Sequence, residues 1–386
     1  MRLDLFLVPL GLPFVASLRD TRRTPEDANG LILKLNNQAV EALENQQSRA
    51  ERSGTCTLAN ATFRKDWALL TTKERTSYID AVKCLQSKPS KSDPSWAPGT
   101  RTRYDDFLAI HIDLTPSIHR TGNFLTWHRY FVWTYERALR DECGYQGTQP
   151  YWNWFAHQND IFQSPVYDGS PSSFGGNGEY VKHAGIFVGR EGIPIPAGEG
   201  GGCVKDGPFK DMVVNLGPVR PGMRDLPISP TGPLGYNPRC LRRDITSFPM
   251  RDMNVENLFN ITLGPASHTV SLFQDEFQGR FPDGFIGMHA SGHFVAGGDA
   301  SDVFSSPADP TFFLHHAMVD RVYWIWQSLH PSSAKTIAGT ITMGNNPPSR
   351  DALVTDLLNM GVNAPSIPLE DAFDTLGDTP FCYIYI

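Results

Sequence analysis

The chain has 386 residues, of which 40% are hydrophobic and 19% are charged, and its formal net charge is −7 at pH 7. This length and composition indicate a globular protein with a sizeable core, rather than a disordered or fibrous chain. A mildly acidic chain without a dense run of lysine and arginine argues against a nucleic-acid partner.

The first residues, MRLDLFLVPLGLPFVAS, combine an early arginine with an apolar stretch and small residues at its end. The stretch is too short to span a bilayer and predicts a secretory signal peptide over residues 1–18, so we expect a secreted, extracellular protein. A buried N-terminal strand is the alternative. No other segment is apolar enough for a membrane span, so we expect no membrane association. Asn60 and Asn260 each begin an Asn-x-Thr sequon, which is compatible with an exported glycoprotein.

Helical patterns dominate the first part of the chain after this segment. The expected helices cover residues 25–52, 103–114 and 122–144, with two short helices within 61–89. Thr71 or Thr72 is expected to cap the second short helix. The helix that starts at residue 103 is expected to stop before Pro116, and the next one, the strongest in the chain, to end at Gly144.

The second part of the chain alternates loops with helices. Residues 161–245 are rich in glycine, proline and serine and predict long surface loops with short strands. A helix is expected over 250–275, and a second strong helical pattern covers 309–330. The tail is loop-rich and ends in FCYIYI. Because no linker separates two halves, we expect residues 19–386 to form a single domain.

The chain contains six cysteines and no Cys-x-x-Cys pair, which argues against zinc-ribbon and thioredoxin-type sites. An even number of cysteines in an exported chain predicts up to three disulfides, and fifteen connectivities are open to six cysteines. The sequence alone does not choose among them. The pairing that we favour is Cys203–Cys240 within the loop-rich middle, Cys84–Cys143, and Cys56–Cys382 between the two ends.

Six of the 11 histidines fall into two groups of three. The groups are His111, His119 and His128, and then His289, His293 and His316. Within the second group, His289 and His293 are four residues apart, so both project from one face of a helix. Neither group includes a cysteine or a carboxylate.

Two triplets of imidazoles point to copper as the metal. Imidazole suits copper, zinc, iron and nickel. A zinc hydrolase, however, usually has one three-ligand site, often with a carboxylate, and a non-haem iron oxygenase uses two histidines and one carboxylate. Six neutral ligands would hold two metal ions and leave cationic charge free to bind an anion such as a phenolate.

Acidic residues lie near the histidines in the sequence and could orient them. Ligand histidines usually anchor their second ring nitrogen on a carboxylate or a carbonyl. Asp320 follows His316 by four residues, on the same helical face, and is predicted to be such a partner. Glu136 follows His128 by eight residues and is expected to pair with an arginine such as Arg140.

These motifs resemble the type-3 copper proteins, the family of tyrosinases, catechol oxidases and haemocyanins. HRTGNFLTWHRYFVWTYERAL resembles the first copper motif, DPTFFLHHAMVDR resembles the second, and PYWNW resembles the strand that follows the first. The similarity covers most of residues 55–330 and is greatest to the short secreted fungal polyphenol oxidases. The resemblance implies a mainly α fold, in which a central four-helix bundle holds a dicopper site and long, disulfide-stapled loops carry a few short strands.

The resemblance also implies the ligands. Carried over by position, His111, His119 and His128 would bind the first of two copper ions, and His289, His293 and His316 the second. Of the adjacent histidines, the family pattern makes His316 the ligand and His315 its neighbour.

The sequence departs from the family pattern at positions that matter for monophenols. Many members carry a cysteine, cross-linked to a ligand ring, where Ser117 stands, so no thioether can form here. Many tyrosinases carry an asparagine directly after the first histidine of the second copper site, where it helps a glutamate to orient a water. Ala290 replaces that asparagine, and Gln278 matches the position of the acid, with Glu276 as the other candidate. Both changes weaken base-assisted binding of monophenols.

The resemblance therefore implies a secreted dicopper polyphenol oxidase that oxidises o-diphenols (catechols) to o-quinones while O2 is reduced to water. Its partners would be phenolic small molecules and O2, and monophenol hydroxylation would be weak or absent. Phe294 and Val295 either shape the substrate entrance or simply pack.

Three other functions stay open at this point. The first is a tyrosinase with full monophenolase activity. The second is a haemocyanin-like oxygen carrier, although only 70 residues follow His316, too few for the sizeable domain that covers the site in molluscan carriers. The third is a dinuclear zinc or iron hydrolase with a convergent six-histidine site.

Overall fold

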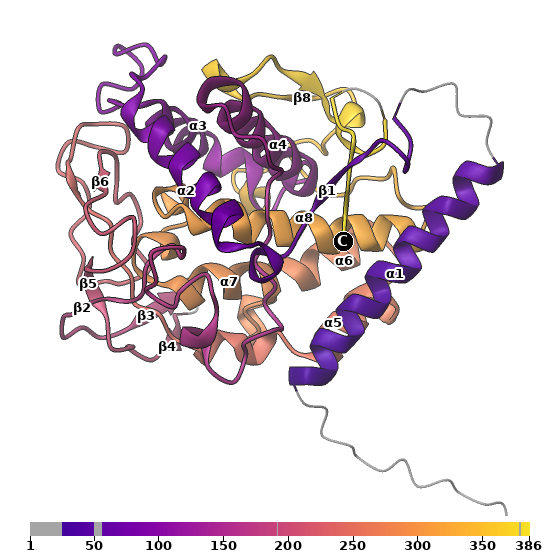
Figure 1. Cartoon of the computed structure of the whole chain (residues 1–386), viewed down its shortest axis with the longest axis horizontal. Helices are drawn as coiled ribbons and strands as arrows, with labels where there is room; N and C mark the ends of the chain where they lie inside the picture. The colour runs from indigo at the N-terminus through magenta and orange to yellow at the C-terminus, as the bar shows by residue number, and fades with distance from the viewer. Residues whose placement is uncertain (1–24, 50–55, 191, 378–379) are drawn as a thin grey trace, which may run out of the picture.

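Helix α8 (Thr311–Leu329) runs through the middle of the structure, with α3 (Arg103–Ile118) and α4 (Phe124–Cys143) above it and α7 (Met288–Ala296) below it in the view of Figure 1. The structure is a computed structural model that describes residues 25–49, 56–190, 192–377 and 380–386. The predicted signal peptide lies outside these residues. The four helices confirm the expected mainly α fold with a central bundle.

The sequence of α8 explains its central place. Every residue from Thr311 to Ser328 is buried, and most of these side chains are apolar or aromatic, so the helix is stable only when other elements surround it. Helix α4 ends as predicted at Gly144, which takes a left-handed conformation with φ of 70° that glycine adopts without a steric penalty.

Four further helices cover the bundle. Helix α1 (Pro25–Arg49) packs on α8 and α5, and α2 (Thr72–Ser87) packs on α3 and α4. Helices α5 (Val255–Thr262) and α6 (Val270–Gln278) replace the single helix expected over 250–275. The break follows from the Gly264-Pro265 step, after which Thr269 starts α6 by accepting the backbone N–H of Leu272.

The helix caps test two further predictions. Thr71 caps α2 in a capping box with Glu74, which confirms one of the two expected caps. The expectation that α3 stops before Pro116 is wrong, because the helix continues to Ile118. Pro116 lies in the last turn of α3, where its ring removes only one hydrogen bond of the helix, the one that would reach the Ile112 carbonyl.

Strands in the described ranges are short and pair two by two, as predicted for a loop-rich chain. The loop region between α4 and α5 holds three antiparallel pairs: β2 (Gly178–Tyr180) with β5 (Gly201–Val204), β3 (Ile186–Val188) with β4 (Ile193–Ile195), and β6 (Val213–Val214) with β7 (Arg239–Cys240). In the tail, β8 (Leu357–Leu358) pairs with β9 (Ile367–Pro368), and β10 (Tyr383–Tyr385) runs parallel to β1 (Thr62–Arg64).

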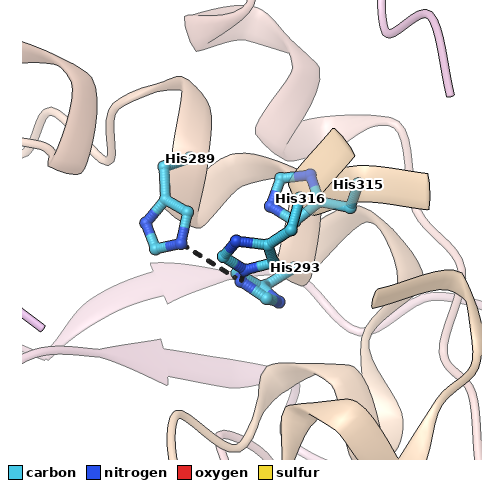
Figure 2. Close-up of side chains that lie close together, drawn as sticks. All are labelled: His289, His293, His315 and His316. Carbon is cyan, nitrogen blue, oxygen red and sulfur yellow. Dashed lines mark hydrogen bonds between the residues drawn. The ribbon is translucent and has the colours of Figure 1, made fainter. Parts of the chain in front are cut away.

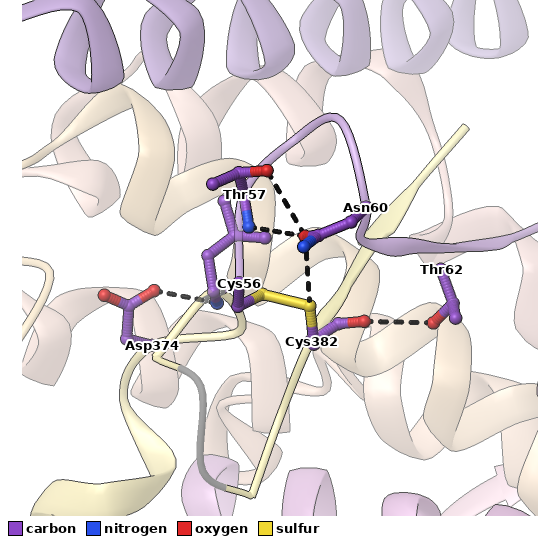
Figure 3. The surroundings of a disulfide bond; sticks show 7 residues. Cys56, Thr57, Asn60, Thr62, Asp374 and Cys382 are labelled. Atoms are coloured by element: carbon purple, nitrogen blue, oxygen red, sulfur yellow. Dashed lines mark hydrogen bonds between the residues drawn. A yellow bond between two sulfur atoms is a disulfide. The ribbon is translucent and has the colours of Figure 1, made fainter. Parts of the chain in front are cut away.

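Three disulfides cross-link the chain. They pair all six cysteines as favoured from the sequence, so that prediction is confirmed. The bridges are Cys56–Cys382, Cys84–Cys143 and Cys203–Cys240. The first joins positions 326 residues apart beside the β1–β10 pair, where the Thr62 hydroxyl also donates to the Cys382 carbonyl (Figure 3). A cross-link between such distant positions stabilises the fold by removing conformations from the unfolded chain.

Asp320 is buried in an ionic network, and its predicted contact with a ligand histidine is wrong. Its carboxylate accepts hydrogen bonds from Arg129 Nε at 2.6 Å and from the hydroxyls of Tyr383 and Tyr385 at 2.6 Å each. Burial raises the pKa of Asp320, but the adjacent guanidinium groups outweigh burial and hold this pKa below its ordinary value. The carboxylate therefore ties α8 to α4 and to β10.

Glu136 belongs to the same network through an arginine that is remote in the sequence. Its carboxylate lies 2.5 Å from Arg64 Nη2. The prediction that an arginine pairs with Glu136 is therefore confirmed, but Arg140 is the wrong arginine. Arg64 is completely buried and also lies 3.6 Å from the centre of the Tyr383 ring. This arginine joins β1, α4 and β10.

Within the described residues, no helix has the length and apolar character needed to cross a lipid bilayer.

Replacing Asp320 with asparagine should lower the free energy of unfolding by about 3–5 kcal/mol, because Arg129 would keep its buried charge without a counter-charge. Chemical denaturation of the two proteins measures this loss. Asp141→Asn is the matched control, because Asp141 pairs with Arg137 on the surface, where both side chains are about half exposed. The control should lose less than about 1 kcal/mol. An equal, small loss in both variants would contradict the structural role assigned to Asp320.

Candidate metal centre

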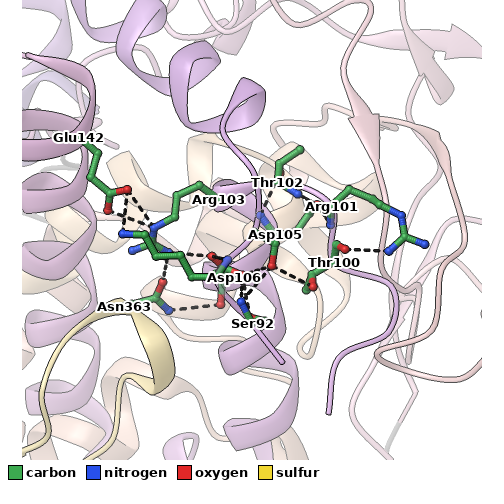
Figure 4. A network of polar contacts seen from close by, with 11 residues as sticks. Ser92, Thr100, Arg101, Thr102, Arg103, Asp105, Asp106, Glu142 and Asn363 are labelled. Carbon is green, nitrogen blue, oxygen red and sulfur yellow. Dashed lines mark hydrogen bonds and ion pairs between the residues drawn. The ribbon is translucent and has the colours of Figure 1, made fainter. Parts of the chain in front are cut away.

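The N-terminus of α3 is held by a network of polar contacts that fixes the position of His111 two turns further on (Figure 4). Thr102 Oγ1 accepts the backbone N–H of Asp105, and the Asp105 carboxylate accepts the N–H of Thr102 at 2.8 Å. Arg103 Nε donates to Glu142 at 3.0 Å, near the end of α4. The two helices that carry the first group of histidines are therefore joined to each other.

The first histidine cluster consists of His111 on α3, His119 directly after α3, and His128 on α4. Each ring nitrogen Nδ1 faces a backbone carbonyl, which can only accept, so Nδ1 carries the proton. The pairs are His111 with Phe304 at 2.7 Å, His119 with Thr115 at 3.2 Å, and His128 with Phe124 at 2.8 Å. The lone pair of Nε2 is therefore free on every ring. In the described structure, the buried Nε2 atoms of His111 and His128 have no hydrogen-bond partner.

The second cluster consists of His289 and His293 on α7 with His315 and His316 on α8, as Figure 2 shows. His293 Nε2 lies 3.3 Å from His289 Nε2 and 3.1 Å from His316 Nε2. Three ring nitrogens thus converge on one point, and a cation among them would satisfy all three lone pairs.

The two clusters face each other across the bundle. The rings of His128 and His316 stack with centroids 4.5 Å apart and an angle of 16° between their planes. Aromatic side chains close the space around them: the ring centroids of Trp127 and Phe124 lie 4.9 Å from that of His128, and the Phe312 centroid lies 4.1 Å from that of His316. The site is therefore walled by apolar rings that exclude water.

Burial also determines the charge of the site. It lowers the pKa of all seven histidines in the two clusters below the ordinary value of 6.5, to about 4 for His119 and about 3 for His315. The rings are therefore neutral at pH 7, which is the state that binds a metal ion.

His315 is the fourth member of the second cluster and packs between His293 and Trp154. Its ring centroid is 4.4 Å from that of His293 and 5.3 Å from that of Trp154. Gly292 makes room for this ring, because a Cβ atom at residue 292 would lie 2.1 Å from His315 Cε1. In the sequence, only the position of Gly292 between two candidate ligands distinguishes it from other glycines.

The two residues considered for a water-orienting acid have other partners. Gln278, at the end of α6, is buried and accepts the backbone N–H of Arg120 at 2.9 Å, so it supports the turn directly after His119. Glu276 pairs with Arg280 at 2.7 Å and accepts a hydrogen bond from Asn260 at 3.2 Å. Neither side chain contacts a histidine.

The residues considered for the substrate entrance differ in burial. Ala290 and the partly buried Phe294 belong to a small apolar cluster that also contains Ile286 and Phe281. Val295 is completely buried in the main core, so it packs and does not line an entrance.

Residues 101–329 match the sequence family described as the common central domain of tyrosinase. That range includes all seven histidines of the two clusters. The chain belongs to the tyrosinase family. The tyrosinase-like protein orsC of Emericella nidulans is 41% identical over 328 residues, which cover 79% of this chain and 85% of that protein. Tyrosinase P of Aspergillus terreus is 37% identical and covers 84% and 91%.

A solved structure supports the same assignment. The structure of a polyphenol oxidase variant from Thermothelomyces thermophila matches with a TM-score of 0.85 and 40% identity, over 94% of this chain and 99% of that one. Membership in the tyrosinase family makes this protein an oxygen-using oxidoreductase with a dinuclear copper site. The donor set fits that cofactor, because the converging atoms are neutral imidazole nitrogens, several of them buried without a partner in the described structure.

The partners of the ring nitrogens were only partly predictable. His119 and His128 bond to the carbonyl four residues earlier, which their helical positions allow. His111 bonds to Phe304, a residue 193 positions away that no local pattern indicates.

Replacing His316 with glutamine should reduce the copper content from two ions per chain to about one, because one of the three converging nitrogens is lost. His315→Gln, a change at the adjacent residue, should leave two ions bound. Metal analysis of the copper-loaded proteins by mass spectrometry tests both. The reverse order of losses would make His315 the ligand.

The metal-free protein should lose stability as the pH falls from 7 to 5. The folded His119 ring has a pKa of about 4, while the unfolded ring takes up a proton below about 6.5, so unfolding binds protons in this range. This group alone accounts for about 2 kcal/mol at pH 5. The melting temperature, measured against pH, should fall less steeply in His119→Gln. Identical slopes would contradict a buried neutral ring at this position.

Proposed function

We propose that the protein is a secreted dicopper polyphenol oxidase that oxidises o-diphenols to o-quinones, with O2 reduced to water and with weak or no hydroxylation of monophenols. Phenolic small molecules and O2 are its partners, and nucleic acids and membranes are not. The observation that carries this proposal is the pair of facing clusters of neutral, converging imidazoles in an apolar enclosure.

Each side chain of the enclosure has a definite part in this chemistry. His111, His119 and His128 hold one copper ion, and His289, His293 and His316 hold the other. The bound copper pair supplies O2 binding and electron transfer. The carbonyl partners of the first cluster keep its rings in the tautomer whose Nε2 lone pair points inward. Phe124 and Phe312 exclude water, which strengthens electrostatic attraction between the cationic site and a phenolic oxygen.

The preference for diphenols follows from the groups around α7. A monophenol has a pKa near 10, so its binding as a phenolate benefits from a base at the entrance. Ala290 offers no hydrogen-bonding group there, and the amide oxygen of Gln278 is already bonded to Arg120. Glu276 is neutralised by Arg280. The structure thus provides no carboxylate base among the residues considered.

The double variant Ala290→Asn/Gln278→Glu should gain monophenolase activity, because it introduces an acid with an adjacent amide to orient a water. We expect the ratio of O2 uptake with phenol to that with catechol to rise about tenfold or more over the wild type. Oxygen consumption by the copper-loaded proteins measures this ratio. The single variants are the controls, and neither should reach the ratio of the double variant.

Comparable O2 uptake by the wild type with phenol and with catechol would contradict the proposed selectivity and make the protein a full tyrosinase. No uptake with either substrate, at full copper occupancy, would favour the oxygen-carrier alternative.

The disulfides support the proposal that the protein is exported. Three disulfides are typical of proteins that fold in an oxidising compartment. We infer that residues 19–386 form one secreted domain. Of the two sequons, Asn60 is exposed, whereas Asn260 is partly buried, so Asn60 is the better acceptor for a glycan.

A further inference from the structure

The histidines differ in solvent exposure, and the difference locates the open side of the metal centre. His111, His128 and His316 are at most 1% exposed, whereas the more exposed rings are His119 at 5%, His289 at 7% and the partly exposed His293. The more exposed side of the centre is therefore that of His119, His289 and His293, and three residues directly follow these rings along the chain. They are Arg120, Ala290 and Phe294.

Arg120 is the one charged residue among these three, and its guanidinium is held in place. The residue has φ of 51°, its backbone N–H donates to Gln278, and its guanidinium donates to the Gly279 carbonyl. The guanidinium carbon also lies 4.6 Å from the centre of the Phe281 ring. Phe281 packs in the same apolar cluster as Ala290, the residue that follows His289, so this cluster links the cation to the second group of histidines.

Among the described residues, no carboxylate lies within ion-pair distance of Arg120. Asp275 is the carboxyl that senses its charge, which opposes the rise that burial causes in the Asp275 pKa. Arg280 differs from Arg120 in this respect. It also lies over an aromatic ring, that of Phe285, but it forms ion pairs with both Glu276 and Asp283. The entrance thus presents one positive charge with free N–H donors to an approaching molecule.

We propose that Arg120 is a specificity residue that binds the carboxylate of anionic catechols while their ring reaches the metal centre. This inference rests on the proposed oxidation of diphenols. A carboxylate receives charge-assisted hydrogen bonds from guanidinium, and stacking on Phe281 orients the group before the substrate arrives, so less entropy is lost on binding. The substrate class is therefore catechols that carry an acidic side chain.

The test compares dihydrocaffeate with its methyl ester as substrates of the copper-loaded protein, through kcat/KM for O2 uptake. Arg120→Gln should lower the acid-to-ester ratio about fivefold to tenfold, mainly through a higher KM for the acid. Arg120→Lys should restore part of the ratio because it keeps the charge. Arg280→Gln is the matched control and should leave the ratio unchanged. An unchanged ratio in Arg120→Gln, or an equal drop in Arg280→Gln, would overturn the proposal.

A binding measurement separates this proposal from the proposed function. Calorimetry should show that benzoate binds the wild type more tightly than benzamide does, and that Arg120→Gln removes the difference. Equal binding of both probes by the wild type would overturn the role of Arg120. If the copper-loaded wild type oxidised neither the acid nor the ester, the proposed function would fail, while the benzoate experiment would still decide whether Arg120 binds a carboxylate.

Discussion

The structure depends on keeping seven imidazole rings neutral at its centre, six of them buried and His293 partly exposed. A buried polar group without a partner is costly, and an isolated buried cation far more so, so these rings must either find hydrogen-bond acceptors or share a metal ion. In the first cluster the Nδ1 atoms bond to backbone carbonyls, which leaves the Nε2 atoms available to a metal ion. The free energy of copper binding is thus available to stabilise the folded chain.

The surrounding fold holds the helices that carry these rings. The capping box at Thr102 and the bond from Arg103 to Glu142 fix α3 against α4. Asp320 and Arg129 join α8 to α4, the two helices that carry His316 and His128. The ionic network and the metal centre therefore share two helices, and we expect a change in the network to shift the histidine rings.

Much of the fold could be predicted because its signals are local. The aromatic helices α4 and α8, the left-handed Gly144 and the His289–His293 spacing all follow from patterns within a few residues. The family motifs assigned the histidines to two groups, and the structure brings the members of each group together.

The predictions that failed concern partners distant in the sequence. Asp320 satisfied the spacing rule for a contact with His316, yet two tyrosines more than 60 residues away and a buried arginine compete for the same carboxylate more strongly. Glu136 likewise pairs with Arg64, 72 residues away, and not with the nearby Arg140. Helix spacing shows which residues can meet, but tertiary packing determines which of them do.

The central claim is that each cluster of converging nitrogens holds one copper ion. X-ray diffraction from crystals of the copper-loaded protein, recorded on both sides of the copper absorption edge, tests it most directly. The account predicts two anomalous peaks, one bonded to Nε2 of His111, His119 and His128 and the other bonded to Nε2 of His289, His293 and His316. A single peak, or a second peak bonded to His315 in place of His316, would contradict it.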